Sequence, residues 1–477
     1  MTKKEMVFDI AIIGAGVVGT AIARELARYQ VSCALLEAQS DVGMGTSKAS
    51  TAIWHTGFDA KPGTLEARLL TRGYTLLEEF VPQAGIPNER TGAVLVAWNQ
   101  DQLNALPQLV AKAHENGVTD VHQLTVEEIY KLEPHINPGA LGGLMVPGES
   151  IICTYSLPLA FATQAVLNDV SLFLNFEVST ITSTDHQTYI ISGADRSIES
   201  RYVINAAGLY SDQIDRLFGF NRFTVTPRRG ELIVFDKLSR PLVQHVLLPI
   251  PTGKTKGVLV SPTVYGNTMV GPTAEDLPDK NQKSTSEEGL AFLWKKGQDI
   301  IAPLMEEEVT TMYAGLRAAT EHSDYQLFPA LDQRYICVGG IRSTGISASM
   351  GIAEYVAELL RQGGLALPLK AAFKPVQVPP IGEQQERPHR SEAALAQNPD
   401  YGRIVCHCEK VSLGEIMDAF KTPIPATTLE GLKRRTRCMQ GRCQGFHCQA
   451  DAVAILAKAC GTTTDRIIAL EDHHEEI

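Results

Sequence analysis

The chain has 477 residues and a net charge of −11, with 44% hydrophobic and 20% charged residues. This length is too great for one hydrophobic core, so we expect two or three domains. The negative charge disfavours a nucleic-acid partner, because such proteins need a basic surface. A run of about 18 apolar residues, which would be needed to span a membrane, does not occur in the sequence. Because Met1–Phe8 also has no signal-peptide pattern, we expect a cytoplasmic protein, with peripheral contact to the inner face of a membrane left open.

The first forty residues predict the start of a dinucleotide-binding fold. Val7–Ile13 becomes wholly apolar, as buried parallel strands do. The spacing of Val17–Tyr29 predicts a helix, and Val31–Leu36 predicts a second strand that ends at Glu37. A glycine fingerprint separates the first strand from the helix, and it consists of Gly14, Gly16 and Gly19. The order is that of a βαβ unit.

Each residue of this fingerprint has a role in binding a nucleotide. Gly14 permits a tight turn, Gly16 lets the backbone approach a pyrophosphate at the helix N-terminus, and Gly19 allows helix and strand to pack closely. Glu37 can accept hydrogen bonds from ribose hydroxyls, which disfavours NADP with its 2′-phosphate. The alternative is a glycine turn that serves packing alone.

The segment after Glu37 favours FAD over NAD. Gly43–Thr51 consists mostly of small and hydroxylated residues, among them Thr46 and Ser47. Such a loop can lie against a diphosphate or the edge of an isoalloxazine ring, and an NAD dehydrogenase would not need it. Only one glycine fingerprint of this kind occurs in the chain, so a second dinucleotide fold is not evident.

Several segments together resemble FAD-dependent oxidoreductases of the D-amino-acid-oxidase superfamily, with glycerol-3-phosphate dehydrogenase and L-2-hydroxyglutarate oxidase as the nearest branches. They are the glycine fingerprint, Glu37, the small-residue loop with His55-Thr56-Gly57, Asn205–Gly208 and Gly339–Gly345. The resemblance covers about residues 7–365. It implies that Ala207 and Gly208 lie near the FAD. It also implies that the turn with Gly340 and Gly345 runs beside the flavin ring, where the N-terminus of the next helix would stabilise the reduced flavin.

The same resemblance implies a substrate site. In the resembling enzymes the arginine at the end of Tyr313–Arg317 anchors a phosphate or carboxylate, and a guanidinium fork suits two charge-assisted bonds to an oxyanion. Arg342 can act in the same way. The glycerol-phosphate enzymes usually carry proline after the first of these arginines, where this chain has Ala318. For each arginine the alternative is a surface ion pair.

His55 is the candidate base for oxidising an alcohol. The hydroxyl proton has to leave while a hydride passes to the flavin, and a neutral histidine suits this task near pH 7. The alternative is a structural histidine in an apolar run, and His322 is a weaker candidate base. Amine oxidation needs less of a base, so alcohol and amine substrates both stay open.

Cysteine spacing predicts a metal site near the C-terminus. Cys406 and Cys408 form a C-x-C, and Cys443 and Cys448 form a C-x4-C. Four thiolates suit an iron–sulfur cluster, whereas zinc sites favour wider pairs than C-x-C. Cys438 stands five residues before Cys443 and repeats the spacing, so it is an alternative ligand. The clustering of six of the nine cysteines near the C-terminus is unlike a secreted disulfide framework.

Residues 404–455 resemble the bacterioferritin-associated-ferredoxin-like [2Fe-2S] domain, which is also found at the C-terminus of the anaerobic glycerol-3-phosphate dehydrogenase flavin subunit. The resemblance implies Cys406, Cys408, Cys443 and Cys448 as the cluster ligands. For the basic residues around them we weigh three roles: raising the reduction potential of the cluster, docking an acidic partner, and forming a solvated face. These residues are Lys433, Arg434, Arg435, Arg437 and Arg442.

These features predict an α/β protein in three parts. We expect a Rossmann-type FAD-binding domain with an interleaved α+β substrate domain over residues 1–370, a proline-rich linker over 371–402, and a small iron–sulfur domain with a tail over 403–477. The predicted function is a FAD-dependent dehydrogenase for a small anionic hydroxy substrate, of the glycerol 3-phosphate or 2-hydroxy acid type. Its electrons would leave through [2Fe-2S] to a quinone, a ferredoxin or a partner subunit. The alternatives are an amine or amino-acid dehydrogenase acting on imino acids or opines, and a redox carrier or sensor without turnover.

Overall fold

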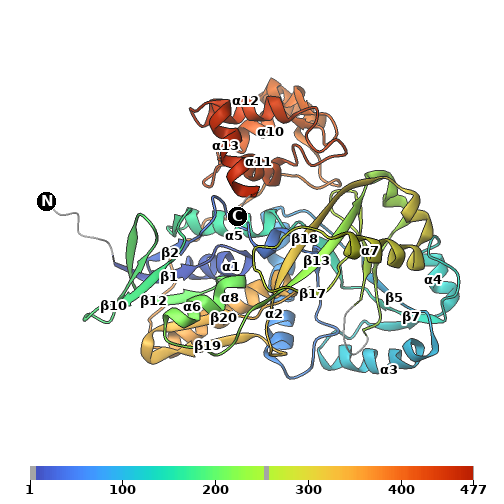
Figure 1. The fold of residues 1–477 in the computed structure, drawn as a ribbon, viewed down its shortest axis with the longest axis horizontal. Helices are drawn as coiled ribbons and strands as arrows, with labels where there is room; N and C mark the ends of the chain where they lie inside the picture. The colour runs from blue at the N-terminus through green and yellow to red at the C-terminus, as the bar shows by residue number, and fades with distance from the viewer. Residues whose placement is uncertain (1–6, 252–256, 476–477) are drawn as a thin grey trace.

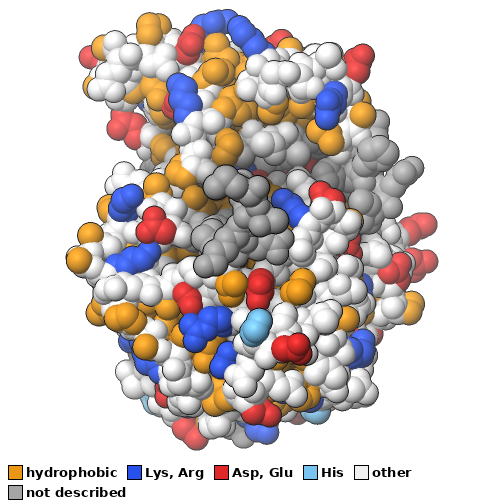
Figure 2. All heavy atoms as spheres, turned by 90° about the vertical axis from the view of Figure 1, so that its left-hand side faces the viewer, with side chains coloured by type: hydrophobic (Ala, Val, Ile, Leu, Met, Phe, Trp, Pro, Cys, Tyr) orange, Lys and Arg blue, Asp and Glu red, His pale blue; other side chains and the backbone are white. Residues whose placement is uncertain are grey.

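The larger part of the chain contains two large sheets, and a small cysteine-rich domain lies on one side of it (Figure 1). The computed structural model describes residues 7–251 and 257–475. Figure 2 shows the cysteine-rich domain as a lobe set off from the body by a notch, with charged side chains of both signs interspersed on this face. The predicted α/β class is confirmed.

The first sheet contains the predicted βαβ unit. Its order is β10-β11-β12-β1-β2-β9, with β20 pairing to β12 and β19 to β20. β1 runs parallel to both β2 and β12, and its residues Ile10 and Ile12 are fully buried, which explains their apolar run. The strands are β1 (Val7–Ile13), β2 (Cys33–Leu36), β9 (Ser171–Phe173), β10 (Thr180–Ser183), β11 (Tyr189–Ser192), β12 (Ser197–Asn205), β19 (Gln326–Ala330) and β20 (Tyr335–Gly339).

Helices of the first part pack tightly on one another at glycines. A Cβ on Gly73 would lie 2.3 Å from the carbonyl oxygen of Ser347, and a Cβ on Gly351 would lie 2.2 Å from that of Leu69. Only glycine lets these two helices approach so closely, and the contact holds the start of α8 against α2. The helices are α1 (Val17–Leu26), α2 (Leu65–Ala84), α5 (Ser156–Leu167), α6 (Ser211–Leu217) and α8 (Gly345–Gln362).

The first helix is shorter than its apolar spacing predicts. α1 ends at Leu26, whereas the pattern continued to Tyr29. The N–H groups of Arg28 and Tyr29 bond to carbonyls three residues earlier, so the last turn tightens before the chain leaves the helix. β2 likewise begins at Cys33 rather than Val31.

The second sheet is built from the inserted segments and carries Arg317. Its order is β17-β13-β16-β15-β14-β5-β7-β6, with β18 pairing to β13 in a long antiparallel ladder. Its elements are β5 (Ala93–Ala97), α3 (Gln100–Glu115), β6 (His122–Leu124), α4 (Val126–Leu132), β7 (Gly142–Val146), β13 (Thr226–Phe235), β14 (Val246–Leu248), β15 (Leu259–Pro262), β16 (Thr268–Gly271), β17 (Glu275–Asp276), α7 (Glu287–Ile300) and β18 (Val309–Ala319). A third sheet, β3-β8-β4, is small and consists of β3 (Ile53–Trp54), β4 (Asn88–Glu89) and β8 (Ser150–Ile152).

The cysteine-rich domain has its own core. Leu432, Ala452 and Leu456 are fully buried in it, together with the sulfur-bearing side chain of Cys438. Its elements are β21 (Ile404–Cys406), β22 (Val411–Ser412), α10 (Leu413–Asp418), α11 (Leu429–Thr436), α12 (Gln449–Ala459) and α13 (Thr464–Glu475). The stretch predicted as a linker contains α9 (Glu392–Gln397) between the short 3-10 helices η6 (Pro388–Arg390) and η7 (Pro399–Gly402), and the predicted domain limits stay a prediction.

The remaining 3-10 helices lie in connections. They are η1 (Thr46–Lys48), η2 (Gly208–Tyr210), η3 (Lys237–Leu242), η4 (Ala302–Glu306) and η5 (Leu331–Gln333). Of the helices in the described part of the chain, none has the length and apolar character that crossing a membrane would require.

Candidate functional site

The glycine fingerprint forms a tight cradle between β1 and α1. Gly14 has a φ of +100°, and a Cβ on it would lie 2.5 Å from the carbonyl oxygen of Ala206. A Cβ on Gly19 would lie 1.9 Å from the carbonyl oxygen of Gly14. The predicted roles of Gly14 and Gly19 therefore have a steric basis: the turn is left-handed, and helix and strand touch. The contact with Ala206 also brings the turn with Ala207 and Gly208 against the fingerprint.

The N-terminus of α1 has the features of an anion-binding site. Its N-cap is Gly16, which supplies no capping side chain, and the N–H of Val17 donates to Ser47 Oγ at 2.9 Å. Glu37 is buried, and its carboxylate accepts from the N–H groups of Ala15 (2.7 Å) and Gln39 (2.9 Å). Burial raises the pKa of Glu37, and these backbone donors oppose that shift. A helix N-terminus beside a glycine turn is a site for a phosphate group.

The other residues predicted at the cofactor lie on elements that converge here. Thr46 Oγ1 donates to the carbonyl oxygen of Leu316 at 2.8 Å, which ties the small-residue loop to β18. A Cβ on Gly345, the first residue of α8, would lie 3.8–3.9 Å from side-chain carbons of Val17 and Val18. Gly208 and Gly340 have φ values of +56° and +62°, so both turns use the left-handed region that favours glycine. The α1 N-terminus, the loop and the α8 N-terminus thus surround one place.

His55 lies directly after β3 and is fixed from two sides. The main-chain N–H of His55 donates to Ser347 Oγ at 2.8 Å, which connects this residue to the first turn of α8. The pairing of β3 with β8 sets Trp54 opposite Ser150, so His55 stands opposite Glu149. His55 Nδ1 lies 2.7 Å from Glu149 Oε2. Sequence reasoning missed Glu149, because these strands are too short to show a period from which their register can be predicted.

Arg317 lies on β18 beside the small-residue loop. A Cβ on Gly315 would come within 1.9 Å of the carbonyl oxygen of Ala49, so strand and loop are in contact. The Arg317 guanidinium donates to the carbonyl oxygen of Thr273 at 2.6 Å, and burial lowers its pKa to about 10, which leaves it cationic at neutral pH. Within the described ranges, the buried Arg317 Nε has no hydrogen-bond partner and no carboxylate forms an ion pair with this side chain. A cation of this kind is suited to an anionic ligand.

Arg342 and His322 have other partners. Arg342 forms an ion pair with Glu66, whose carboxylate also accepts from Thr344 Oγ1 at 2.8 Å. The alternative of an ion pair therefore describes Arg342 in this structure, and its substrate role stays a prediction. The His322 ring is 45% exposed and lies 3.7 Å from Glu321, within the same turn.

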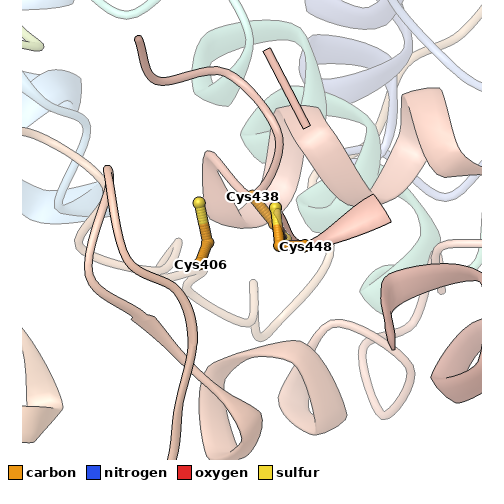
Figure 3. Close-up of side chains that lie close together, drawn as sticks. All are labelled: Cys406, Cys438 and Cys448. Carbon is orange, nitrogen blue, oxygen red and sulfur yellow. Dashed lines mark hydrogen bonds between the residues drawn. The ribbon is translucent and has the colours of Figure 1, made fainter. Parts of the chain in front are cut away.

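Three thiols meet in the cysteine-rich domain. The sulfur atoms of Cys406, Cys438 and Cys448 are buried and all lie within 4.8 Å of one another. Figure 3 shows the side chains of Cys438 and Cys448 next to each other, with Cys406 across from them. Cys408 and Cys443 are less buried and form a second thiol contact. The structure thus brings together two of the predicted ligands with Cys438, and pairs the other two.

Nearby backbone N–H groups act to lower the thiol pKa of each of the four predicted ligands. They belong to Glu409 and Met439 for Cys406, to Cys443 for Cys408, to His447 and Gly445 for Cys443, and to Met439 for Cys448. Such donors stabilise thiolates and tune iron–sulfur clusters. The neighbouring thiols of Cys438 and Cys448 lower the pKa of Cys406, whereas contact with the sulfurs of Cys406 and Cys448 and then burial raise the pKa of Cys438.

One glycine allows the two cysteine motifs to meet. A Cβ on Gly441 would lie 2.4 Å from the Cβ of Cys408, closer than real side chains approach. The turn before Gly441 is also tight, since Arg437 and Met439 on either side of Cys438 have φ values of +71° and +69°. The loop therefore keeps an unusual conformation that places the C-x-C against the C-x4-C.

Three buried arginines among the five basic residues hold this domain to the rest of the chain, and the exposed Arg442 also pairs with Glu308 of the larger part. Arg435 lies 2.6 and 2.9 Å from the two carboxylate oxygens of Asp41, in the loop after β2, and Arg434 lies 2.8 Å from the same carboxylate. Arg437 pairs with Glu409 at 3.2 Å and lies over the ring of Tyr265. The interpretations of a solvated face and of docking to an external partner are therefore wrong for these three buried arginines.

Replacing Asp41 by asparagine is expected to weaken the docking of the cysteine-rich domain by about 3–5 kcal/mol, because two buried guanidinium groups lose their counter-charge. Hydrogen exchange of α11 measures the docking. The control is Asp276→Asn, which removes a carboxylate 2.6 Å from Arg228 in an exposed pair. We expect that change to cost less than about 1 kcal/mol. Equal exchange in α11 for both variants would contradict this account of Asp41.

Known proteins resemble both parts of the chain. Residues 9–359 match the family model of FAD-dependent oxidoreductases (DAO), and residues 404–458 match the BFD-like [2Fe-2S] binding domain. A glycerol 3-phosphate dehydrogenase of Caloramator mitchellensis is 37% identical over 98% of this chain and 97% of its own length. The bovine mitochondrial L-2-hydroxyglutarate dehydrogenase is 31% identical over 56% of this chain and 61% of its own.

A solved structure shares the larger part of the fold. It is the dithionite-reduced L-α-glycerophosphate oxidase of Mycoplasma pneumoniae with FAD bound, with a TM-score of 0.74 and 28% identity over 78% of this chain and 99% of the other. This chain belongs to the FAD-dependent oxidoreductase family and carries a BFD-like [2Fe-2S] domain. It is an enzyme related to glycerol-3-phosphate dehydrogenases, with FAD and [2Fe-2S] as cofactors.

Proposed function

We propose that this enzyme oxidises glycerol 3-phosphate, and that the electrons leave singly through the cluster. The observation that carries the proposal is Arg317, a half-buried cation on the strand that contacts the small-residue loop, with no carboxylate partner among the described residues. A relative that shares both domains and is named for glycerol 3-phosphate supports this substrate over a 2-hydroxy acid.

We assign different roles to the two polar side chains of the site: Arg317 binds the substrate, and His55 accepts its proton. Arg317 would bind the phosphate through two charge-assisted hydrogen bonds. The free ring nitrogen of His55 would accept the hydroxyl proton as the carbon is oxidised. Gly14, Gly16 and the N-terminus of α1 fit the pyrophosphate of FAD, which when bound supplies the hydride acceptor.

For the cluster we propose Cys406, Cys408, Cys443 and Cys448, the four thiols of the C-x-C and C-x4-C motifs in the BFD-like domain, whose pKa nearby backbone N–H groups act to lower. A cluster gives electrons a one-electron exit, for which an oxidase would have no need. A dehydrogenase with a quinone, a ferredoxin or a partner subunit as acceptor fits this arrangement. Peripheral membrane contact would follow from a quinone acceptor.

The substrate class is tested by anaerobic bleaching of the flavin. Glycerol 3-phosphate, L-2-hydroxyglutarate and L-proline are added separately to the purified holoenzyme. We expect rapid bleaching by glycerol 3-phosphate alone. Bleaching by L-2-hydroxyglutarate or L-proline instead would move the proposal to a hydroxy-acid or an amino-acid dehydrogenase, and no bleaching by any of them would support a redox carrier.

Replacing Arg317 by alanine is expected to weaken binding of the anionic substrate by about 2–5 kcal/mol, seen as a raised KM, because the phosphate loses its half-buried counter-charge. The control is Arg228→Ala on the neighbouring strand, where the guanidinium is already paired with Asp276. We expect a much smaller change there. An unchanged KM in Arg317→Ala would remove this arginine from the site.

A further inference from the structure

Glu149 is a buried carboxylate whose side-chain hydrogen bonds, among the residues that the structure describes, all go to His55 and Thr56. Its side chain is fully buried, and that of His55 is 17% exposed. One carboxylate oxygen faces His55 Nδ1 at 2.7 Å. The other accepts from the N–H of Thr56 at 2.6 Å and from its hydroxyl at 2.8 Å. Both oxygens therefore face donors, and the carboxylate cannot turn away from the ring.

This geometry determines which ring nitrogen of His55 carries the proton. A carboxylate can only accept, so Nδ1 must hold a hydrogen and Nε2 keeps its lone pair. When Nε2 takes the hydroxyl proton, the imidazolium that forms lies against a negative charge in a buried setting, which lowers the cost of forming it. The ring is held in place at the same time, because the main chain of His55 is bonded to Ser347.

A second histidine, His245, also pairs with a buried glutamate, but in another part of the fold. His245 Nδ1 lies 2.8 Å from the buried Glu133, which also accepts from the N–H groups of Gln244 and His245. The exposures of the two side chains equal those of the first pair, 17% and 0%. This pair joins the end of α4 to the start of β14 in the second sheet, whereas His55 is bonded to the first turn of α8. A histidine paired with a buried glutamate therefore also occurs away from the candidate site. What distinguishes the His55–Glu149 pair is its position beside the first turn of α8.

We propose that Glu149 is a positioning residue that keeps His55 in the Nδ1–H tautomer and stabilises it once protonated. The proposal rests on the proposed function, in which His55 is the base. The substrate's O–H bond breaks and its proton moves to Nε2, while a hydride leaves the carbon for FAD, the two-electron oxidant, and a carbonyl forms. Glu149 acts only through His55, because its fully buried side chain does not reach substrate or cofactor.

The test compares Glu149→Gln with Glu133→Gln in the purified holoenzyme. A glutamine has an NH2 group, so in either orientation it sets a donor against His55 Nδ1–H or against Thr56. We expect Glu149→Gln to slow flavin reduction by glycerol 3-phosphate by about 100-fold, the lower end of what a positioned base contributes, with KM nearly unchanged. Glu133→Gln should keep the wild-type rate. Reduction by dithionite should be the same in all three proteins.

A second readout does not depend on turnover. Nitrogen NMR of isotope-labelled histidine, with the His55 signals assigned by their loss in His55→Gln, should show the Nδ1–H tautomer in the wild type. Glu149→Gln should lose this tautomer, and Glu149→Asp, which keeps the charge, should recover part of it. An unchanged tautomer together with an unchanged rate in Glu149→Gln would overturn the proposal. If no substrate reduces the wild-type flavin, the proposed function fails, and the tautomer alone decides for or against Glu149.

Discussion

Replacement of His55 by glutamine is expected to slow flavin reduction by substrate about 100- to 10,000-fold, the range that a positioned general base contributes. The side chain of glutamine can still hydrogen-bond, but it cannot take the hydroxyl proton near neutral pH. The main-chain bond to Ser347 survives the change, so the first turn of α8 keeps its place. FAD content and reduction by dithionite should therefore stay as in the wild type.

The measurement is the rate of anaerobic flavin bleaching after rapid mixing with glycerol 3-phosphate. The matched control is His245→Gln, which removes a histidine with the same buried glutamate partner and the same exposure from the second sheet. We expect the control to retain the wild-type rate. If both variants lose the same activity, His55 has only the structural role that pairing with a glutamate implies.

Replacement of Cys448 by serine is expected to abolish the [2Fe-2S] cluster, whereas Cys438→Ser is expected to keep it. The two sulfur atoms are only 4.0 Å apart and both are buried, so the variants differ in little except ligand chemistry. Cys448 is the N-cap of α12, and the backbone N–H of Met439 acts to lower its thiol pKa, as backbone N–H groups do for the other predicted ligands. Because metal binding stabilises a small domain of this kind, loss of the cluster should also lower its thermal stability.

Iron content, visible absorption and the electron paramagnetic resonance of the reduced protein measure the cluster. Cys460→Ser, at an exposed cysteine outside the site, is the control for general effects of removing a thiol. The opposite result, a cluster lost with Cys438 and kept without Cys448, would assign Cys438 as the ligand. Zinc in place of iron in the wild type would contradict the electron-exit role of the domain.

The βαβ unit could be predicted because its signals are local. The glycine fingerprint, the apolar strand and the acidic residue at the end of β2 lie within about thirty residues, and each has one steric or hydrogen-bonding role. The C-x-C and C-x4-C motifs also predicted a metal site from the sequence alone, since thiolate spacing reflects ligand geometry. What these motifs could not show is the position of Cys438, which the loop around Gly441 brings against Cys406 and Cys448.

The contacts that distinguish this site come from residues far apart in sequence. Glu149 is 94 residues from His55, and Asp41 is 394 residues from Arg435. Two-residue strands carry no periodicity that could predict the first contact. A run of arginines gives no sign of which carboxylate it will meet. The three roles weighed from the sequence, tuning the cluster's potential, docking a partner and forming a solvated face, therefore did not include holding the two domains together.

We propose that electrons pass from substrate through the flavin to the cluster within one chain. The most direct test is to add glycerol 3-phosphate anaerobically to the purified protein and to follow flavin absorption and the paramagnetic resonance of the cluster together. We predict that the flavin bleaches first and that the signal of a reduced [2Fe-2S] cluster then appears. A fully bleached flavin beside a cluster that stays oxidised would contradict the account.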